Sequence, residues 1–323
     1  MKTKPNKKEK TQKSEFALLK TMGAIHAPSG NESAMTNFLL DYIKKESKNW
    51  KRKPKVYAGR GFQDNIILVF GKPRTAIFAH IDSIGFTVRY GKQLVKVGGP
   101  RLKTGFQLCG TDGKGYQEAE LHVKADKAGN VEGIEYKAKR DFERGTDLVF
   151  KQNWREDAEY VQGCYMDNRL GVYNALKVAE TLKDGAIVFS TWEEHGGGSV
   201  AYLQQFLFDN FGIIQGLISD ISWISDGVHY AKGPVISMRD SLIPRRSYVN
   251  KIIAIANKYN CAYQLEVEGS GGSDGKELQM AAVPWDWCFI GAAEENVHTP
   301  DEKVHKKDIE GMIALYKVLM KEL

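Results

Sequence analysis

Short runs of branched and aromatic residues, most of them followed by acidic residues or histidine, constrain the fold of this chain most strongly. Six runs have the density of apolar residues that buried strands show: 65–70, 75–80, 186–191, 213–218, 263–267 and 286–290. Other segments carry apolar residues at helical spacing: 35–43, 170–182, 248–259 and 309–319. Strands that alternate with helices predict an α/β fold with a mostly parallel, mixed sheet flanked by helices.

A capping box is expected just before the first of these helices. Residues 29–32 read S-G-N-E, and Ser29 and Glu32 have the spacing at which Ser and Glu side chains satisfy backbone N–H groups at a helix start. We therefore expect this pair to begin the helix.

Residues 85–157 have a different character. Helical periodicity disappears, glycine is frequent, and in one alternating run Ala119, Leu121 and Val123 would share a face. The sequence D-K-A-G-N at 126–130 predicts a turn before the next strand. This range predicts a small all-β barrel or sandwich, inserted into an α/β catalytic domain that is formed by 14–84 and 158–323.

Composition excludes several classes of protein. The chain has 323 residues, of which 42% are hydrophobic, so it can bury a large core. It has no run of about 18 uncharged apolar residues, so we expect no membrane partner. Four cysteines without a C-x-x-C pair predict reduced thiols and a cytoplasmic location.

The net charge of +6 is concentrated at the N-terminus. Residues 1–13 hold six Lys and one Glu, and we interpret them as a basic, disordered, solubilising tail. The rest of the chain is nearly neutral, so we expect no specific nucleic-acid partner.

Polar side chains gather where the predicted strands end or helices begin, and in open α/β sheets ligands bind beyond the carboxyl ends of strands. Five segments supply them: His80 with Asp82, Asp167, Glu193 with Glu194, Asp220, and His298. Imidazole and carboxylate are the ligands of a hydrolytic zinc or cobalt site.

The number of these groups suits two cations about 3.5–4 Å apart, which need a shared carboxylate and about two further ligands each. Asp82 can accept the second N–H of the His80 ring and orient it. Of the adjacent Glu193 and Glu194, one can bind metal while the other serves as general base and then acid. The pattern predicts a two-metal hydrolase.

Each residue taken singly has a plainer interpretation. Asp167 can cap the helix that follows it, and His298 can belong to an ordinary loop. Only the joint occurrence of five such segments favours a metal site.

Six motifs occur in order along the chain: A-H-I-D-S-I-G-F (79–86), M-D-N-R-L-G (166–171), T-W-E-E-H-G-G-G-S (191–199), S-D-I-S (219–222), G-S-G-G-S-D-G (269–275) and V-H-T-P (297–300). Together they resemble the tetrahedral aminopeptidase family of di-metal metallopeptidases, which includes deblocking, glutamyl and leucyl aminopeptidases. The resemblance extends from Pro28 to the final helix, includes the β insertion, and implies a di-zinc exopeptidase-like fold.

The resemblance also implies roles for individual residues. His80 and Asp220 would bind one divalent ion, Glu194 and His298 the other, and Asp167 would bridge them. Asp82 would orient His80, and Glu193 would be the catalytic base that activates a water held between the metals. The implied cofactors are two divalent ions per subunit, Zn²⁺ or Co²⁺, with Mn²⁺ also accepted by such ligands.

The same resemblance implies a reaction and an assembly. The N-terminal residue would be removed from short peptides, and the β insertion would build a dimer from which a hollow dodecamer assembles. Ser83 and His195 depart from the family, which usually has Glu and an apolar residue there. His195 and the glycine loop supply the candidates for the substrate pocket: His195, Gly271, Gly272, Ser273 and Asp274.

Three alternatives stay open at this point. A related two-metal deacylase or carboxypeptidase would use similar ligands. A serine hydrolase would use Ser273 in a G-x-S-x-G pattern, with Asp286 or Asp301 and His305. It would leave five residues unexplained: His80, Asp167, Glu193, Glu194 and Asp220. An inactive scaffold would bind through its Lys-rich tail, although every proposed ligand is intact.

Overall fold

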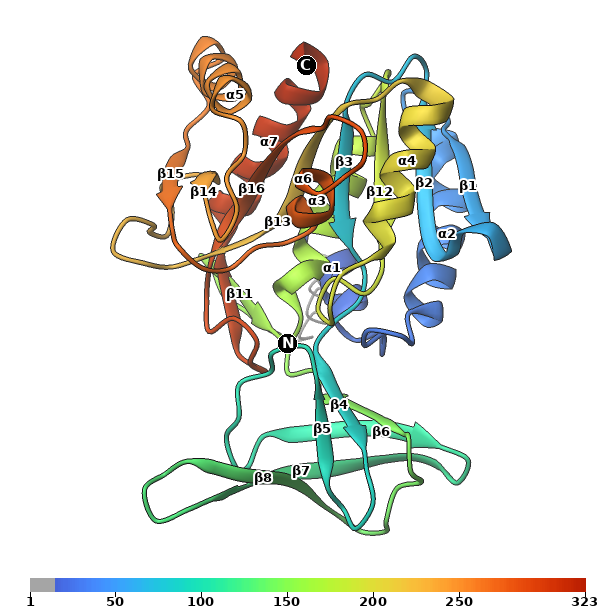
Figure 1. The fold of residues 1–323 in the computed structure, drawn as a ribbon, viewed down its shortest axis with the longest axis vertical. Coiled ribbons are helices and arrows are strands. Elements are labelled where there is room, and N and C mark those ends of the chain that lie inside the picture. Colours follow the sequence, from blue (N-terminus) through green and yellow to red (C-terminus); the bar gives the residue numbers. More distant parts are fainter. Residues whose placement is uncertain (1–14) are drawn as a thin grey trace, which may run out of the picture.

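The structure is a computed structural model, and it describes residues 15–323. The basic tail predicted at 1–13 lies outside the described residues. An α/β body carries a smaller antiparallel sheet that projects from one end of it (Figure 1). Within 15–323, no helix is long and apolar enough to cross a membrane.

The large sheet runs in the order β1-β2-β12-β3-β13-β16-β17-β11-β10, and β14 and β15 join it at β16. Its strands are β1 (Lys55–Gly59), β2 (Gln63–Phe70), β3 (Ala76–His80), β10 (Arg155–Glu156), β11 (Tyr160–Gly163), β12 (Gly185–Ser190), β13 (Gln215–Trp223), β14 (Val235–Arg239), β15 (Gln264–Val267), β16 (Asp286–Glu295) and β17 (Glu302–His305). The central strands β12, β3, β13 and β16 are parallel, while β2 and β17 pair antiparallel to their neighbours. The predicted mixed sheet is therefore confirmed.

Helices cover both faces of this sheet, because its central strands carry apolar side chains on both faces. In β3, Ile77 and Ala79 face one hydrophobic cluster and Ala76 and Phe78 face another. The first cluster is completed by α1 (Ala17–Gly23), α2 (Ser33–Glu46), α3 (Met166–Ala179), α5 (Arg246–Lys258) and α7 (Lys306–Glu322), and the second by α4 (Ser199–Phe211) and α6 (Gly275–Gln279). Short 3-10 turns occur at Ser47–Asn49 and Arg60–Phe62.

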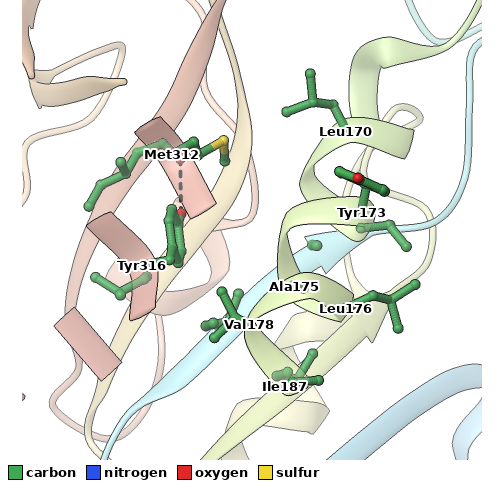
Figure 2. Close-up of a cluster of buried hydrophobic side chains, with 14 of the residues drawn as sticks. Leu170, Tyr173, Ala175, Leu176, Val178, Ile187, Met312 and Tyr316 are labelled. Atoms are coloured by element: carbon green, nitrogen blue, oxygen red, sulfur yellow. Dashed lines mark hydrogen bonds between the residues drawn. The ribbon is translucent and has the colours of Figure 1, made fainter. Parts of the chain in front are cut away.

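The packing of α3 against α7 fixes the helix that carries Asp167. Figure 2 shows Leu170, Tyr173 and Leu176 of α3 in the same buried cluster as Met312 and Tyr316 of α7. The Tyr316 hydroxyl donates hydrogen bonds to the carbonyl oxygens of β13 and β16, at 2.7 and 2.9 Å. This cluster ties α3 and α7 to the two strands at the centre of the sheet.

The expected capping box is wrong. Helix α2 begins at Ser33, and no side chain caps its first turn. The Ser29 hydroxyl donates instead to Asp82 at 2.6 Å, and the Glu32 carboxylate accepts from the Gly30 N–H at 2.8 Å. A tertiary hydrogen bond to a buried carboxylate therefore replaces the local cap.

The second sheet is antiparallel, in the order β5-β4-β9-β6-β7-β8. Its strands are β4 (Gly85–Val88), β5 (Leu94–Val97), β6 (Gln107–Asp112), β7 (Gly115–Ala125), β8 (Val131–Ala138) and β9 (Asp147–Phe150). A bridge between Gln93 and Glu135 brings its two ends together, so it is nearly a barrel around its own core. The range predicted for the insertion contains all of these strands and also β10, which pairs in the large sheet.

Candidate metal centre

The seven predicted site residues come from different elements that meet at one edge of the large sheet. His80 ends β3, Asp167 is the second residue of α3, and Asp220 lies within β13. The segment after β12 holds Glu193 and Glu194, the segment after β3 holds Asp82, and the segment between β16 and β17 holds His298. The strand of Asp220 is longer than predicted, because β13 pairs with β16 over nine residues, as far as Trp223.

Asp167 lies between the two histidines. One of its oxygens, Oδ1, is 3.2 Å from His80 Nε2, and the other, Oδ2, is 3.2 Å from His298 Nε2. Asp220 Oδ2 is 3.5 Å from His80 Nε2, and Glu194 Oε2 is 3.3 Å from His298 Nε2. Two groups with ligand atoms within 4.8 Å of one another result: His80, Asp167 and Asp220, and Asp167, Glu194 and His298.

The electrostatics of these groups fit cations. Both ring nitrogens of His80 and one oxygen of Glu194 are buried without a hydrogen-bond partner, which is costly unless another group satisfies them. Burial opposes a charge on His80, but Asp220 and Glu193 outweigh it and raise the pKa of His80 well above its ordinary value. For His298, Asp167 and Glu194 likewise outweigh burial and raise the pKa to about 12. In the metal-free protein, the protons held by His80 and His298 carry the positive charge that metal ions would supply. The residues therefore fit a site for divalent metal ions.

The two adjacent glutamates differ in position. Burial and the charge of Asp167 raise the pKa of Glu194 to about 7, and this residue lies in a ligand group. Glu193 belongs to neither group, although its Oε2 is 3.8 Å from His80 Nε2. Burial raises the pKa of Glu193 well above its ordinary value. Glu193 therefore borders the site without being one of its ligand candidates.

Asp82 holds several parts of the site together. Its Oδ1 is 3.4 Å from His80 Nδ1 and accepts from the Glu193 N–H at 3.2 Å. Its Oδ2 accepts from the Glu194 N–H at 3.1 Å and from the Ser29 hydroxyl at 2.6 Å. One fully buried carboxylate thus lies beside the imidazole ring and holds the backbone N–H groups of the two glutamates.

Two further residues support the site and were missed by sequence reasoning. Glu302 is fully buried, and its two oxygens accept from the backbone N–H groups of Asp167 and His298, at 3.3 and 2.9 Å. Arg169 is also fully buried, and its guanidinium donates to the carbonyl oxygens of Ile81 and Asp82. Arg169 stands inside the motif 166–171 and Glu302 lies four residues after His298, and these positions were the only signal available.

A cavity of about 270 Å³ opens from the ligand groups. Of the residues predicted for the substrate pocket, Gly271 and Gly272 line it. His195 lines a neighbouring recess instead, where its Nδ1 accepts from the Gly98 N–H. Ser273 donates to Asp220 Oδ2 at 2.6 Å, and Asp274 accepts from the Ser190 hydroxyl at 2.5 Å; neither residue lines the cavity.

The residues of a serine hydrolase are held apart by other partners. The Ser273 hydroxyl binds a carboxylate, Asp220, and not an imidazole. The His305 Nδ1 accepts from the Lys307 N–H at the start of α7. Asp286 is paired with Arg245 and Asp301 with Arg155. The described residues therefore contain no Ser–His–Asp arrangement from this set.

An open α/β sheet with histidine and carboxylate groups at the ends of its strands is a combination found in hydrolases that use metal ions. The sequence matches the family model described as M42 glutamyl aminopeptidase over residues 130–315, more than half of the chain. The chain belongs to this family, and it is a metal-dependent peptide hydrolase. The matched range contains Asp167 and His298, whereas His80 and Asp82 precede it and join the site only through the fold.

Solved structures share the whole fold. The aminopeptidase APDkam598 from the archaeon Desulfurococcus kamchatkensis has a TM-score of 0.84 at 19% identity, over 95% of this chain and 94% of that one. The TET1 peptidase of Pyrococcus horikoshii, which can assemble into a tetrahedron or a large octahedral shell, has a TM-score of 0.79 at 23% identity, over 96% and 100%. An endoglucanase of Thermotoga maritima has a TM-score of 0.70 at 17% identity, over 94% and 96%. At these identities the likeness establishes the fold alone.

Proposed function

We propose that this protein is a two-metal aminopeptidase that removes the N-terminal residue from short, unblocked peptides. The observation that carries the proposal is the position of Asp167, which presents one carboxylate oxygen to each of two histidines at 3.2 Å. A carboxylate in this position can be shared by two cations, and its charge reduces their mutual repulsion.

The ligands divide into two sets around this carboxylate. In the proposal, His80 and Asp220 hold one divalent ion, Glu194 and His298 hold the other, and Asp167 belongs to both. When bound, such ions supply Lewis-acid polarisation of the scissile carbonyl and make the attacking water more acidic. Zn²⁺, Co²⁺ and Mn²⁺ all accept this mixture of imidazole and carboxylate.

Glu193 is the general base in this proposal. Its Oε2 lies 3.8 Å from His80 Nε2, and it lines the cavity without belonging to either ligand group, so its carboxylate is available to take a proton from the attacking water and return it to the leaving amine. Burial raises its pKa, which is the direction in which a carboxyl group is shifted for general acid–base work. Asp82 is a positioning residue, because it acts through the His80 ring and the backbone of Glu193.

The chain's assembly and location are also part of the proposal. We propose a homo-oligomer of dimers that form a dodecamer, with the sheet β4–β9 at the contacts, supported by the family and by the shells that the TET1 peptidase forms. We propose a cytoplasmic location, supported by four cysteines that are free in the structure.

Hydrolysis of a mixed set of short peptides tests the proposed reaction. Rates are measured on unblocked and N-acetylated versions of each peptide, before and after chelation, with Zn²⁺, Co²⁺ and Mn²⁺ restored separately. We expect stepwise N-terminal trimming of the unblocked peptides alone, lost with the chelator and regained with at least one metal. Equal rates on blocked and unblocked peptides would replace the proposal with a related two-metal deacylase. Release of C-terminal residues would replace it with a carboxypeptidase.

A further inference from the structure

The cavity beside the ligand groups extends into an acidic recess that the proposed chemistry does not use. On one side the cavity is bordered by Glu193 and the ligand candidates, and on the other by the ends of β13, β14 and β15. We call the side of the cavity formed by the ends of β13, β14 and β15 the recess. Its acidic residues are Asp240, Glu266 and Glu268. Three carboxylates therefore face the space where part of a substrate would lie.

These carboxylates are poorly compensated within the described residues. Asp240 and Glu266 are 6% and 8% exposed, and neither lies within ion-pair distance of a described lysine or arginine, although the charge of Arg239 acts on Asp240 from farther away. Their hydrogen bonds come from neutral groups: the Leu242 N–H donates to Asp240 at 2.6 Å, and the Ser222 hydroxyl donates to Glu266. Burial raises the pKa of both carboxyl groups. A buried carboxylate in this condition gains stability from an incoming cation.

Lysine and arginine side chains do not supply that cation. No lysine or arginine lines the cavity. Arg239 follows Met238 at the end of β14, but its Nε donates to the backbone carbonyl oxygens of Asp240 and Glu268, at 3.2 and 3.1 Å. The side-chain charges that line the recess are therefore all negative.

The separation of the three carboxylates in the recess suits an organic cation better than a metal ion. Among the described residues, the ligand atoms of Asp240, Glu266 and Glu268 do not form a group within 4.8 Å of one another, unlike those around Asp167. The recess also has apolar walls, from Trp223 and Phe289. Long cationic side chains lay their methylene stems on apolar surfaces and place the charged end among acceptors.

We infer that this recess holds the side chain of a cationic N-terminal residue, lysine or arginine, and makes the enzyme selective for such peptides. The inference rests on the proposed aminopeptidase reaction, which places the scissile bond at the ligand groups and leaves the first side chain to enter the recess. Trp223 borders the recess over Gly271, where its ring can also attract the cation. A glutamyl side chain, which the family description would suggest, would meet three carboxylates and no cation.

The recess could instead hold the α-ammonium group that every unblocked peptide carries. The two possibilities differ in what a neutral side chain does. If the recess binds the side chain, replacing lysine by norleucine, which keeps the stem and removes the charge, lowers the rate. If the recess binds the α-ammonium group, lysine and norleucine peptides behave alike.

The experiment compares kcat/KM of the metal-loaded enzyme on peptides that differ only in their first residue: lysine, arginine, norleucine and glutamate. We expect lysine and arginine to exceed norleucine by about tenfold or more, the size of a charge-assisted hydrogen bond, and glutamate to be poorest. Glu266→Gln and Asp240→Asn, which keep the shape and remove a charge, should each lower the lysine-to-norleucine ratio by about tenfold. Glu310→Gln, at an exposed residue of α7, is the matched control and should leave the ratio unchanged.

The outcomes separate this inference from the proposed function. Trimming with equal rates for lysine and norleucine, or a Glu266→Gln variant that slows both peptides equally, would overturn the inference and keep the aminopeptidase. If no peptide is trimmed, the proposed function fails, and binding of lysinamide and norleucinamide to the zinc-loaded protein is then measured by calorimetry. Tighter binding of lysinamide, lost in Glu266→Gln, supports the cationic recess, and equal binding overturns it.

Discussion

Glu193 and Glu194 are neighbours in the chain, and their different surroundings predict different effects of the same substitution. Glu193→Gln should retain metal and lose about 10²–10⁴-fold in kcat, the usual contribution of a general acid–base group. Glu194→Gln should lose metal, because Glu194 Oε2 faces His298 in a ligand group. Metal content by elemental analysis, together with kcat, checks the pair. A Glu193→Gln enzyme with near-normal turnover would remove Glu193 as the base.

The raised pKa of His298 predicts that metal binding releases protons. In the metal-free protein this imidazole, with a pKa of about 12, is protonated at pH 7.5, whereas a metal ligand must be neutral. Protons therefore compete with the metal, and affinity should fall as pH is lowered. Calorimetry of Zn²⁺ binding in two buffers of different ionisation enthalpy measures the protons released.

We expect this release to be smaller in His298→Gln, which lacks the titrating ring. If the binding enthalpy is the same in both buffers, then the histidines are already neutral at pH 7.5, and the electrostatic account of the site is wrong.

The contact between helix α3 and strand β13 sets the distance between Asp167 and Asp220. Gly171 of α3 lies so close to the sheet that a methyl group there would overlap the Ser219 carbonyl oxygen. Gly171→Ala should therefore push α3 away from β13, lower stability by about 1–3 kcal/mol, and weaken metal binding because Asp167 moves with the helix. Urea unfolding and zinc titration measure the two effects.

Gly133→Ala is the matched control, because a methyl group on this residue of β8 would meet no atom within 4 Å. It should leave zinc affinity unchanged. Should Gly171→Ala bind zinc as tightly as the control, the α3–β13 contact does not position Asp167.

At the scale of the whole molecule, the candidate metal centre joins β3, α3, β13 and the segments beside β12 and β17. Without cations, the three carboxylates and two histidines of the ligand groups lie together at this junction, so metal binding should stabilise the fold as a whole. Ligand linkage gives about 2.7 kcal/mol at a free metal concentration 100 times Kd. A chelator should therefore lower Tm, and added Zn²⁺ should restore it.

The variant Asp167→Asn supplies the comparison for this thermal shift. Because Asp167 belongs to both ligand groups, the variant should lose most of the chelator-dependent change in Tm and the binding of both ions. Loss of one ion with the other retained would show that Asp167 does not bridge.

Local sequence patterns predicted many of the elements and named the residues of the candidate site. Apolar runs located the buried strands β2, β3, β12 and β16 because both faces of a central strand must be apolar. The alternation in Ala119 and Leu121 located the separate β sheet, because one face of its strands packs on its own core. The polar residues at strand ends identified a site, since parallel strands bring those ends to one edge.

Only the tertiary structure decided how these residues are used. Ser29 donates its hydroxyl to Asp82 and does not cap a helix start, because the buried carboxylate at a distant strand end requires a hydrogen-bond donor. Glu302 and Arg169 support the ligands through backbone groups, and such contacts leave no periodic pattern in a sequence. The negative charge of the recess comes from separate segments of the chain. That no lysine or arginine lines the recess follows from how these segments pack together, and no single segment encodes that packing.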